Sequence, residues 1–200
     1  AKYHYIAWKD LAAELDITID LTFNAQLKGI SRMDSLDRIL AYGGREADFS
    51  LAEKEELAKK KNDHYVELLK ELTPADLLPG VKTFIMEAKE RSIPCAIASA
   101  SKNAPAILEK LGVLADFDYI VDPDSLAQGK PSPEIFLKAA EALQISPEEA
   151  VGFEDAQAGI DGIKAAGMYA VGIIEQEELI GADQLVQRLD ELAIDQLLQK

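Results

Sequence analysis

The sequence predicts an α/β protein in which a parallel sheet flanked by helices follows a separate helical subdomain. Two observations lead to this prediction. The first 72 residues show helical patterns and no convincing strand, whereas the rest of the chain alternates short apolar runs with amphipathic helical patterns. The chain has 200 residues, of which 48% are hydrophobic, and this is enough for a buried core.

The helical part contains three amphipathic helices. Ser50 and Glu53 form a capping-box pattern at the head of the longest one, and Gly43-Gly44 ends the helix before it. Residues at helical spacing form the three apolar faces: Ile6, Leu11 and Leu15; Leu36, Ile39 and Leu40; and Leu57, Tyr65, Val66, Leu68 and Leu69.

A linker follows the helical part. Thr73-Pro74 and Pro79-Gly80 interrupt the helical pattern, so we expect a helical domain over residues 1–75 and an α/β domain over residues 76–200. In the second domain we expect helices at 81–91, 104–111, 133–143 and 158–166, and strands at 93–98, 119–121, 151–153 and 169–174. The amphipathic stretch 184–200 is expected to close the sheet.

The charge of the chain excludes some classes of partner. There are 21 basic and 36 acidic residues, so the formal charge is −15, which argues against binding to nucleic acids or anionic membranes. No apolar run is long enough to cross a bilayer. We therefore expect a cytoplasmic protein with no nucleic-acid or membrane partner, and a monomer, because no exposed apolar heptad pattern is present.

Three polar clusters lie after expected strands, two of them directly at a strand end and one in the loop beyond a strand. Hydroxyl groups, Lys102 and Asn103 occupy residues 99–103, Lys130 lies in a loop before a helix, and Glu154-Asp155 follows the third strand. Ligands of open α/β sheets bind at the carboxyl ends of the strands. Hydroxyl groups and a lysine suit a phosphate, and paired carboxylates suit Mg²⁺. Together the clusters predict a magnesium-dependent phosphoryl-transfer site.

Each cluster also has a simpler interpretation. Small polar residues commonly end strands in turns, and a loop lysine is usually solvated. Asp155 could simply be a helix cap. In the helical part, residues 28–32 form a short basic loop that could bind a phosphate, whereas the lysine run 59–61 resembles solvated helix surface. His4 and Trp8 lie four residues apart on one helical face, where simple packing is an equal alternative.

The three clusters resemble the second, third and fourth motifs of the haloacid dehalogenase superfamily. The resemblance extends over essentially the whole chain, and it implies a Rossmann-like parallel sheet core with an inserted α-helical cap. His4-x-x-x-Trp8, residues 26–36, Lys61-Asn62-Asp63 and residues 99–103 resemble the branch of that superfamily that isomerises glucose phosphates. The expected reaction is the interconversion of β-D-glucose 1-phosphate and D-glucose 6-phosphate through an aspartyl-phosphate enzyme and β-glucose 1,6-bisphosphate.

This resemblance implies a role for each matching residue. Ser99 and Lys130 would hold the transferring phosphoryl group, Glu154 and Asp155 would bind Mg²⁺, and His4 would position the general acid/base. The substrate, a small phosphosugar, would be bound by Trp8, Lys28, Arg32, Lys61, Asn62, Ala100, Ser101, Lys102 and Asn103.

One motif of the superfamily is not found in these residues. The first motif, Asp-x-Asp-Gly, would end just before Ala1, and it carries the nucleophile, the acid/base aspartate and a central strand. We expect the protein to contain it ahead of Ala1. A related sugar-phosphate phosphatase, or an inactive phosphosugar-binding chain if the motif is truly absent, are the alternatives.

Overall fold

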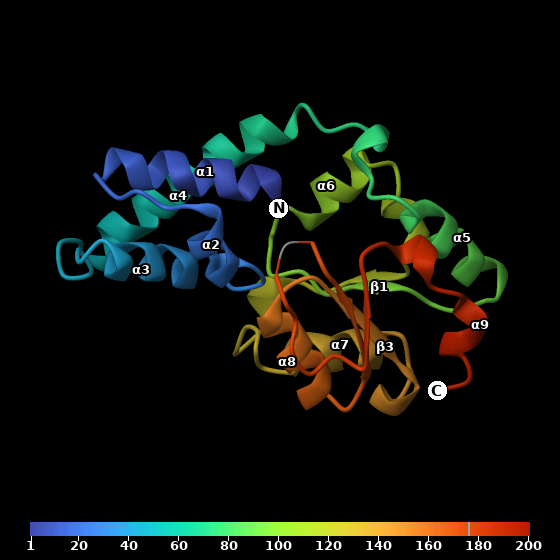
Figure 1. Ribbon diagram of the computed structural model, residues 1–200. Coiled ribbons are helices and arrows are strands. Elements are labelled where there is room, and N and C mark those ends of the chain that lie inside the picture. Colours follow the sequence, from blue (N-terminus) through green and yellow to red (C-terminus); the bar gives the residue numbers. More distant parts are fainter. Residues whose placement is uncertain (176) are drawn as a thin grey trace. The chain divides into compact units, whose positions relative to one another are not determined.

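A computed structural model describes residues 1–175 and 177–200 and divides the chain into two compact units, Ala1–Leu72 and Thr73–Lys200. The first unit ends three residues before the predicted domain boundary. Figure 1 shows helices alone in the first unit, and strands enclosed by helices in the second.

The first unit is built on the helices α1 (Lys2–Glu14), α2 (Leu21–Asn24), η1 (Ala25–Leu27), α3 (Arg32–Tyr42) and α4 (Leu51–Leu69). The predicted capping box is present, because Ser50 Oγ accepts a hydrogen bond from Glu53 N and Ser50 N donates to the Glu53 carboxylate. Leu36, Ile39 and Leu40 are fully buried beneath α1 and α4. Their apolar cluster also contains Trp8, so α1 is anchored to the other helices by its large side chains.

The second unit contains two parallel sheets. In one sheet, β1 (Ala96–Ile97) pairs with β2 (Tyr119–Ile120), and in the other the order is β3 (Val151–Glu154), β4 (Tyr169–Ile173) and β5 (Gln184–Val186). Within the described part of the chain, β1 and β3 are each paired along one edge only. The helices of this unit are η2 (Pro74–Asp76), α5 (Val81–Glu90), α6 (Ala104–Lys110), η3 (Leu114–Asp116), η4 (Pro123–Ser125), α7 (Glu134–Ala142), η5 (Pro147–Glu149), α8 (Gln157–Ala165), η6 (Leu189–Glu191) and α9 (Ile194–Leu197).

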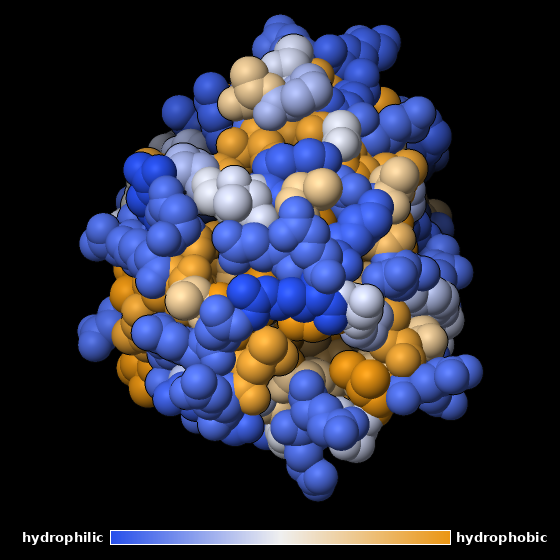
Figure 2. Space-filling model, turned by 90° about the vertical axis from the view of Figure 1, so that its right-hand side faces the viewer, coloured by the Kyte–Doolittle hydropathy of each residue, from blue (hydrophilic) through white to orange (hydrophobic). Residues whose placement is uncertain are grey.

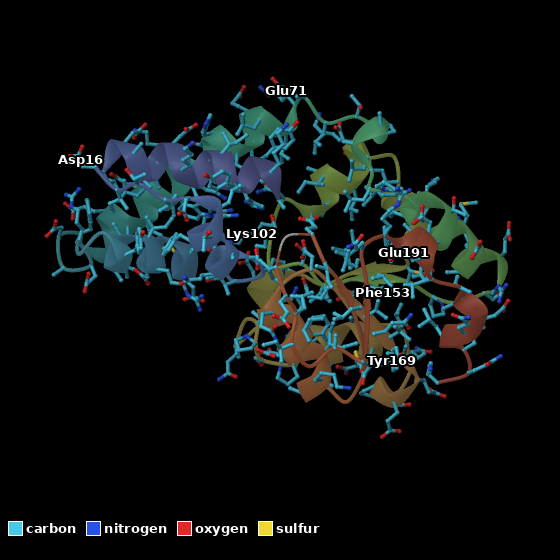
Figure 3. All side chains as sticks on the ribbon, viewed as in Figure 1. Asp16, Glu71, Lys102, Phe153, Tyr169 and Glu191 are labelled. Carbon is cyan, nitrogen blue, oxygen red and sulfur yellow. The ribbon has the colours of Figure 1, made fainter. Side chains whose placement is uncertain are left out.

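Helices cover both faces of the larger sheet, as expected for a Rossmann-like parallel sheet. On one face Ala170 of β4 packs with Ile160 and Ile163 of α8 and with side chains of α7. On the other face Phe153 and Tyr169, both labelled in Figure 3, pack with Phe84 of α5 and with side chains of η6 and α9. Successive residues of β3 and β4 therefore face opposite helical layers, which is why both strands consist of small, apolar and aromatic residues apart from Glu154 at the end of β3.

The surface seen in Figure 2 is mainly hydrophilic, and its hydrophobic side chains lie in small separate groups. None of the helices that the structure describes is long and apolar enough to cross a membrane.

Candidate active site

An ion pair lies at the carboxyl end of β3. Lys130 Nζ is 2.7 Å from Glu154 Oε2, and these side chains are only 5% and 10% exposed. Burial raises the pKa of the Glu154 carboxyl above its usual range, while the Lys130 ammonium opposes this shift. Asp155 N donates to Glu154 Oε1 at 3.2 Å. The strand end thus holds one carboxylate between an ammonium and a backbone N–H, with a second carboxylate on the next residue.

The loop after β1 arranges two hydroxyl groups in succession. Ser99 Oγ accepts a hydrogen bond from Ser101 N at 3.1 Å, and Ser101 Oγ accepts one from Asn103 N at 3.2 Å. Each hydroxyl oxygen is fixed by the backbone, and its O–H can still donate to a ligand. Ala100 is half-buried between them, and the exposed Lys102, labelled in Figure 3, forms an ion pair with Asp124 at 2.8 Å. The loop can therefore present donors to an anion.

The carboxylates at the end of β3 fit a partial Mg²⁺ site. Glu154 and Asp155 are adjacent oxygen donors, and Mg²⁺ in phosphoryl-transfer sites commonly takes one or two carboxylates and completes its shell with phosphate and water oxygens. No group of three potential metal-ligating side chains occurs among residues 1–175 and 177–200. Substrate, water or other protein groups would have to provide the remaining ligands.

The helical unit contains a buried lysine among aromatic rings. Lys61 of α4 is 3% exposed, and its Nζ lies 2.8 Å from His4 Nδ1 on α1. The same nitrogen is 4.6 Å from the centre of the Trp8 ring and 4.7 Å from the centre of the Tyr65 ring. Tyr65 also stacks on His4, with ring centres 3.9 Å apart. Lys61 thus lies in an aromatic enclosure with a histidine as its hydrogen-bond partner.

Burial controls the protonation of this enclosure. Burial, followed by the charge of Lys61, lowers the pKa of His4 to about 2, so the imidazole is neutral and its Nδ1 accepts from Lys61. Burial, followed by the charge of Arg32, lowers the pKa of Lys61 to about 7. Burial raises the pKa of Tyr65 to about 12. The lysine is therefore the group of this cluster that titrates near neutral pH.

A second cationic group lies close to the enclosure. Arg32 begins α3, and its Nη2 donates to Asn62 Oδ1 at 3.0 Å. Ser31 caps the helix by accepting from Asp34 N, which fixes the backbone that leads into Arg32. Lys28 lies in the preceding loop. In the described chain neither Arg32 nor the protonated form of Lys61 has a carboxylate as an ion-pair partner, so an anionic ligand would not have to displace one.

The structure assembles the predicted residues in two groups, one in each unit. His4, Trp8 and Lys61 meet, and Arg32 joins Asn62, while in the other unit Lys130 joins Glu154. No site role was predicted from the sequence for three residues that contact these groups: Tyr65, Phe136, over whose ring Lys130 Nζ lies at 5.2 Å, and Gly159, beside Glu154. Tyr65 could have been found from its spacing, four residues after Lys61, and Gly159 from being a glycine within a helix.

The chain matches the sequence profile of the haloacid dehalogenase-like hydrolases over residues 2–167. It is 47% identical to the β-phosphoglucomutase of Bacillus subtilis over 197 residues. This aligned region covers 98% of this chain and 87% of the relative. A crystal structure of β-phosphoglucomutase from Clostridium difficile superposes with a TM-score of 0.95 at 43% identity, covering 99% of this chain and 89% of the other. The fructose-1-phosphate phosphatase YqaB of Escherichia coli is 29% identical over 171 residues, 85% of this chain and 87% of the phosphatase.

Proposed function

Because the chain belongs to the haloacid dehalogenase-like hydrolase family, we propose that it is a magnesium-dependent β-phosphoglucomutase. It would interconvert β-D-glucose 1-phosphate and D-glucose 6-phosphate through an aspartyl-phosphate enzyme and β-glucose 1,6-bisphosphate. The similarity to the Bacillus subtilis mutase along nearly the whole chain supports this choice of reaction. The proposal includes a monomer that acts in the cytoplasm on a small phosphosugar.

The observation that carries the proposal is the cationic group of the helical unit. A mutase must hold a non-reacting phosphate as well as the transferring one, because the bisphosphate has to bind in either orientation. A hydrolase needs only one phosphate site. Arg32 and Lys61 would provide one cationic site, which has no carboxylate partner, and Lys130 with the hydroxyl of Ser99 would provide the other.

The core residues would act on the transferring group. The Ser99 hydroxyl would donate to one phosphoryl oxygen, and the Lys130 ammonium would balance the negative charge that collects on the equatorial oxygens. When bound by Glu154 and Asp155, Mg²⁺ would supply further charge neutralisation and align the phosphoryl oxygens. The Glu154 carboxylate would also keep Lys130 oriented, since their contact is buried and short.

Phosphoryl transfer also needs a nucleophile and an acid/base. A carboxylate oxygen forms a bond to phosphorus while the bond between phosphorus and the sugar oxygen breaks, and the released sugar oxygen takes a proton from the acid. The proposal takes both groups from the two aspartates of the first motif of the superfamily. The neutral His4 ring, held by Lys61 and Tyr65, would position the acid/base through a hydrogen bond from Nε2–H.

A coupled assay on the full-length protein tests this proposal. The protein is given β-glucose 1-phosphate, Mg²⁺ and a trace of glucose 1,6-bisphosphate, and both glucose 6-phosphate and free phosphate are measured. We expect glucose 6-phosphate as the main product. Free phosphate as the main product would instead identify a sugar-phosphate phosphatase, which the similarity to YqaB makes the second candidate. Magnesium-dependent binding of the sugar phosphate without turnover would identify a phosphosugar-binding protein.

Substitution of Arg32 separates the mutase from the phosphatase. Arg32→Ala removes a charged hydrogen-bond donor, so we expect the transition state of the mutase reaction to lose about 1.5–3 kcal/mol of stabilisation. This loss corresponds to a fall in kcat/KM of roughly 10- to 150-fold. Arg38→Ala is a matched control, because Arg38 lies on the same helix, is exposed and donates to the backbone oxygen of Gln26. An equally small effect of both substitutions contradicts the role of the second phosphate site.

A further inference from the structure

Gly159 lies against the carboxylate of Glu154. It is the third residue of α8, and it is buried. A methyl group on its Cα would fall on Cγ, Cδ and Oε2 of Glu154, far inside van der Waals contact. These three atoms include the oxygen that contacts Lys130. The helix backbone thus takes the space that a side chain would occupy, and it closes one side of the carboxylate.

The other sides of the carboxylate are also occupied. Lys130 Nζ contacts Oε2, and Asp155 N donates to Oε1. The Lys130 ammonium lies over the ring of Phe136. That ring in turn packs against α8 at Gly162, where an added methyl group would lie 2.8 Å from Cε2 of Phe136. Two glycines three residues apart on one face of α8 therefore adjoin the two partners of Lys130.

We propose that Gly159 is a positioning residue for the Glu154–Lys130 pair. Glycine is a poorer helix former than alanine, so helix stability alone favours a side chain here. The backbone of α8 comes so close to the carboxylate that only glycine, which has no side chain, fits at this residue. With a methyl group at residue 159 the carboxylate must turn away, and Lys130 loses the partner that fixes its ammonium. The steric role of Gly159 does not depend on the proposed function, whereas its catalytic consequence rests on that function.

A thermodynamic cycle tests the geometry without any activity measurement. Urea unfolding is followed for the wild-type protein, Gly159→Ala, Glu154→Ala and the double variant. We expect Gly159→Ala to lower the urea midpoint of the wild-type protein by roughly 0.5–1 M. In the Glu154→Ala background the same substitution should leave the midpoint unchanged or raise it, because the clash is gone and alanine favours the helix. An equal loss in both backgrounds overturns the proposal.

Two further substitutions, Glu154→Gln and Gly129→Ala, complete the test. Glu154→Gln keeps the size of the side chain and removes its charge, so Gly159→Ala should remain as harmful there as in the wild-type protein. This comparison also serves if Glu154→Ala does not fold. If the loss disappears with glutamine, the contact is not steric, and the proposal is wrong. Gly129→Ala is the matched control for stability, because a methyl group on Gly129 meets nothing within 4 Å, and its midpoint should not change.

The catalytic consequence is measured by the separation of kcat from KM. Gly159→Ala should lower kcat of the mutase reaction about 10- to 100-fold, the scale expected for a displacement of roughly 1 Å in the site. KM for the sugar phosphate should stay within about twofold, since Arg32 is untouched. A raised KM with unchanged kcat overturns the positioning role. If the full-length protein shows no mutase activity, the proposed function fails, and the urea cycle alone decides the role of Gly159.

Discussion

Substitution of Lys61 by methionine should stabilise the protein at neutral pH. The lysine is buried beside Trp8 and Tyr65, and burial, followed by the charge of Arg32, lowers its pKa from 10.5 to about 7. The unfolded chain binds this proton up to a pH near 10.5, whereas the folded chain binds it only below about 7. Unfolding therefore takes up a proton between these two pH values, and wild-type stability rises with pH in this window.

The size of the effect follows from the pKa shift. One pKa unit corresponds to about 1.4 kcal/mol, so the depressed pKa of Lys61 costs the folded state roughly 4 kcal/mol at pH 7 and little near pH 10.5. Methionine avoids this cost and keeps the apolar contacts, but it leaves His4 Nδ1 without its donor, a loss of about 1 kcal/mol. We expect Lys61→Met to be more stable than wild type by about 2–3 kcal/mol at pH 7. This advantage should disappear near pH 10.

Urea unfolding at pH 7, 8, 9 and 10 measures the difference. The series stops at pH 10 because burial raises the pKa of Tyr65 to about 12, and titration of the unfolded tyrosine would reverse the trend at higher pH. Lys60→Met is the matched control, because Lys60 is on the same helix, is exposed, and pairs with Glu14. A stability difference between Lys61→Met and wild type that stays constant from pH 7 to pH 10 would refute the reasoning.

Three further substitutions are predicted from single contacts. Gly80→Ala forces a side chain onto a residue with φ of +82°, 2.5 Å from a backbone nitrogen of η6, so unfolding free energy measured in urea should fall by about 2–4 kcal/mol. Lys130→Ala leaves the buried Glu154 carboxylate without a counter-charge, so the free energy of unfolding should fall by about 3–5 kcal/mol at pH 8. The loss should be smaller at pH 5, where that carboxyl can bind a proton, and thermal unfolding at both pH values measures the difference. Asp124→Asn frees the exposed Lys102, and KM for the sugar phosphate should fall by up to about fivefold, the scale of a surface ion pair.

The order of the elements could be predicted from the sequence better than the lengths of the strands. The predicted helix 81–91 is observed as Val81–Glu90, because its ends are marked by local signals. The apolar run 93–98 predicts a strand of six residues, but β1 consists of Ala96–Ile97 only. A strand extends as far as its neighbour pairs with it, and β2 is equally short. The stretch 184–200 was expected to close the sheet, and its first three residues do so as β5, which pairs with β4. That they form a strand was not predicted, because the stretch has an amphipathic pattern.

The strand-end clusters were predicted because they depend on local order along the chain. Glu154-Asp155 had to lie at the end of β3 once that strand was assigned, and the ion pair with Lys130 agrees with this placement. Which groups surround the pair depends on tertiary packing. Phe136 of α7 contacts Lys130 and also packs against Gly162 of α8, and no periodicity in the sequence encodes that packing.

The lysine run of α4 shows why burial, rather than residue type, separates site from surface. Successive residues of a helix are rotated by about 100°, so three neighbouring lysines point in three directions. Lys59 is exposed and pairs with Asp63 one turn later, and Lys60 is exposed and pairs with Glu14 of α1. Lys61 alone turns toward the aromatic enclosure. The first two have carboxylate partners, whereas Lys61 has a histidine and two rings, which do not cancel its charge. Because its pKa of about 7 leaves Lys61 only partly protonated at neutral pH, an anion that enters this enclosure would favour the charged form of Lys61 and would interact with it in a poorly solvated environment.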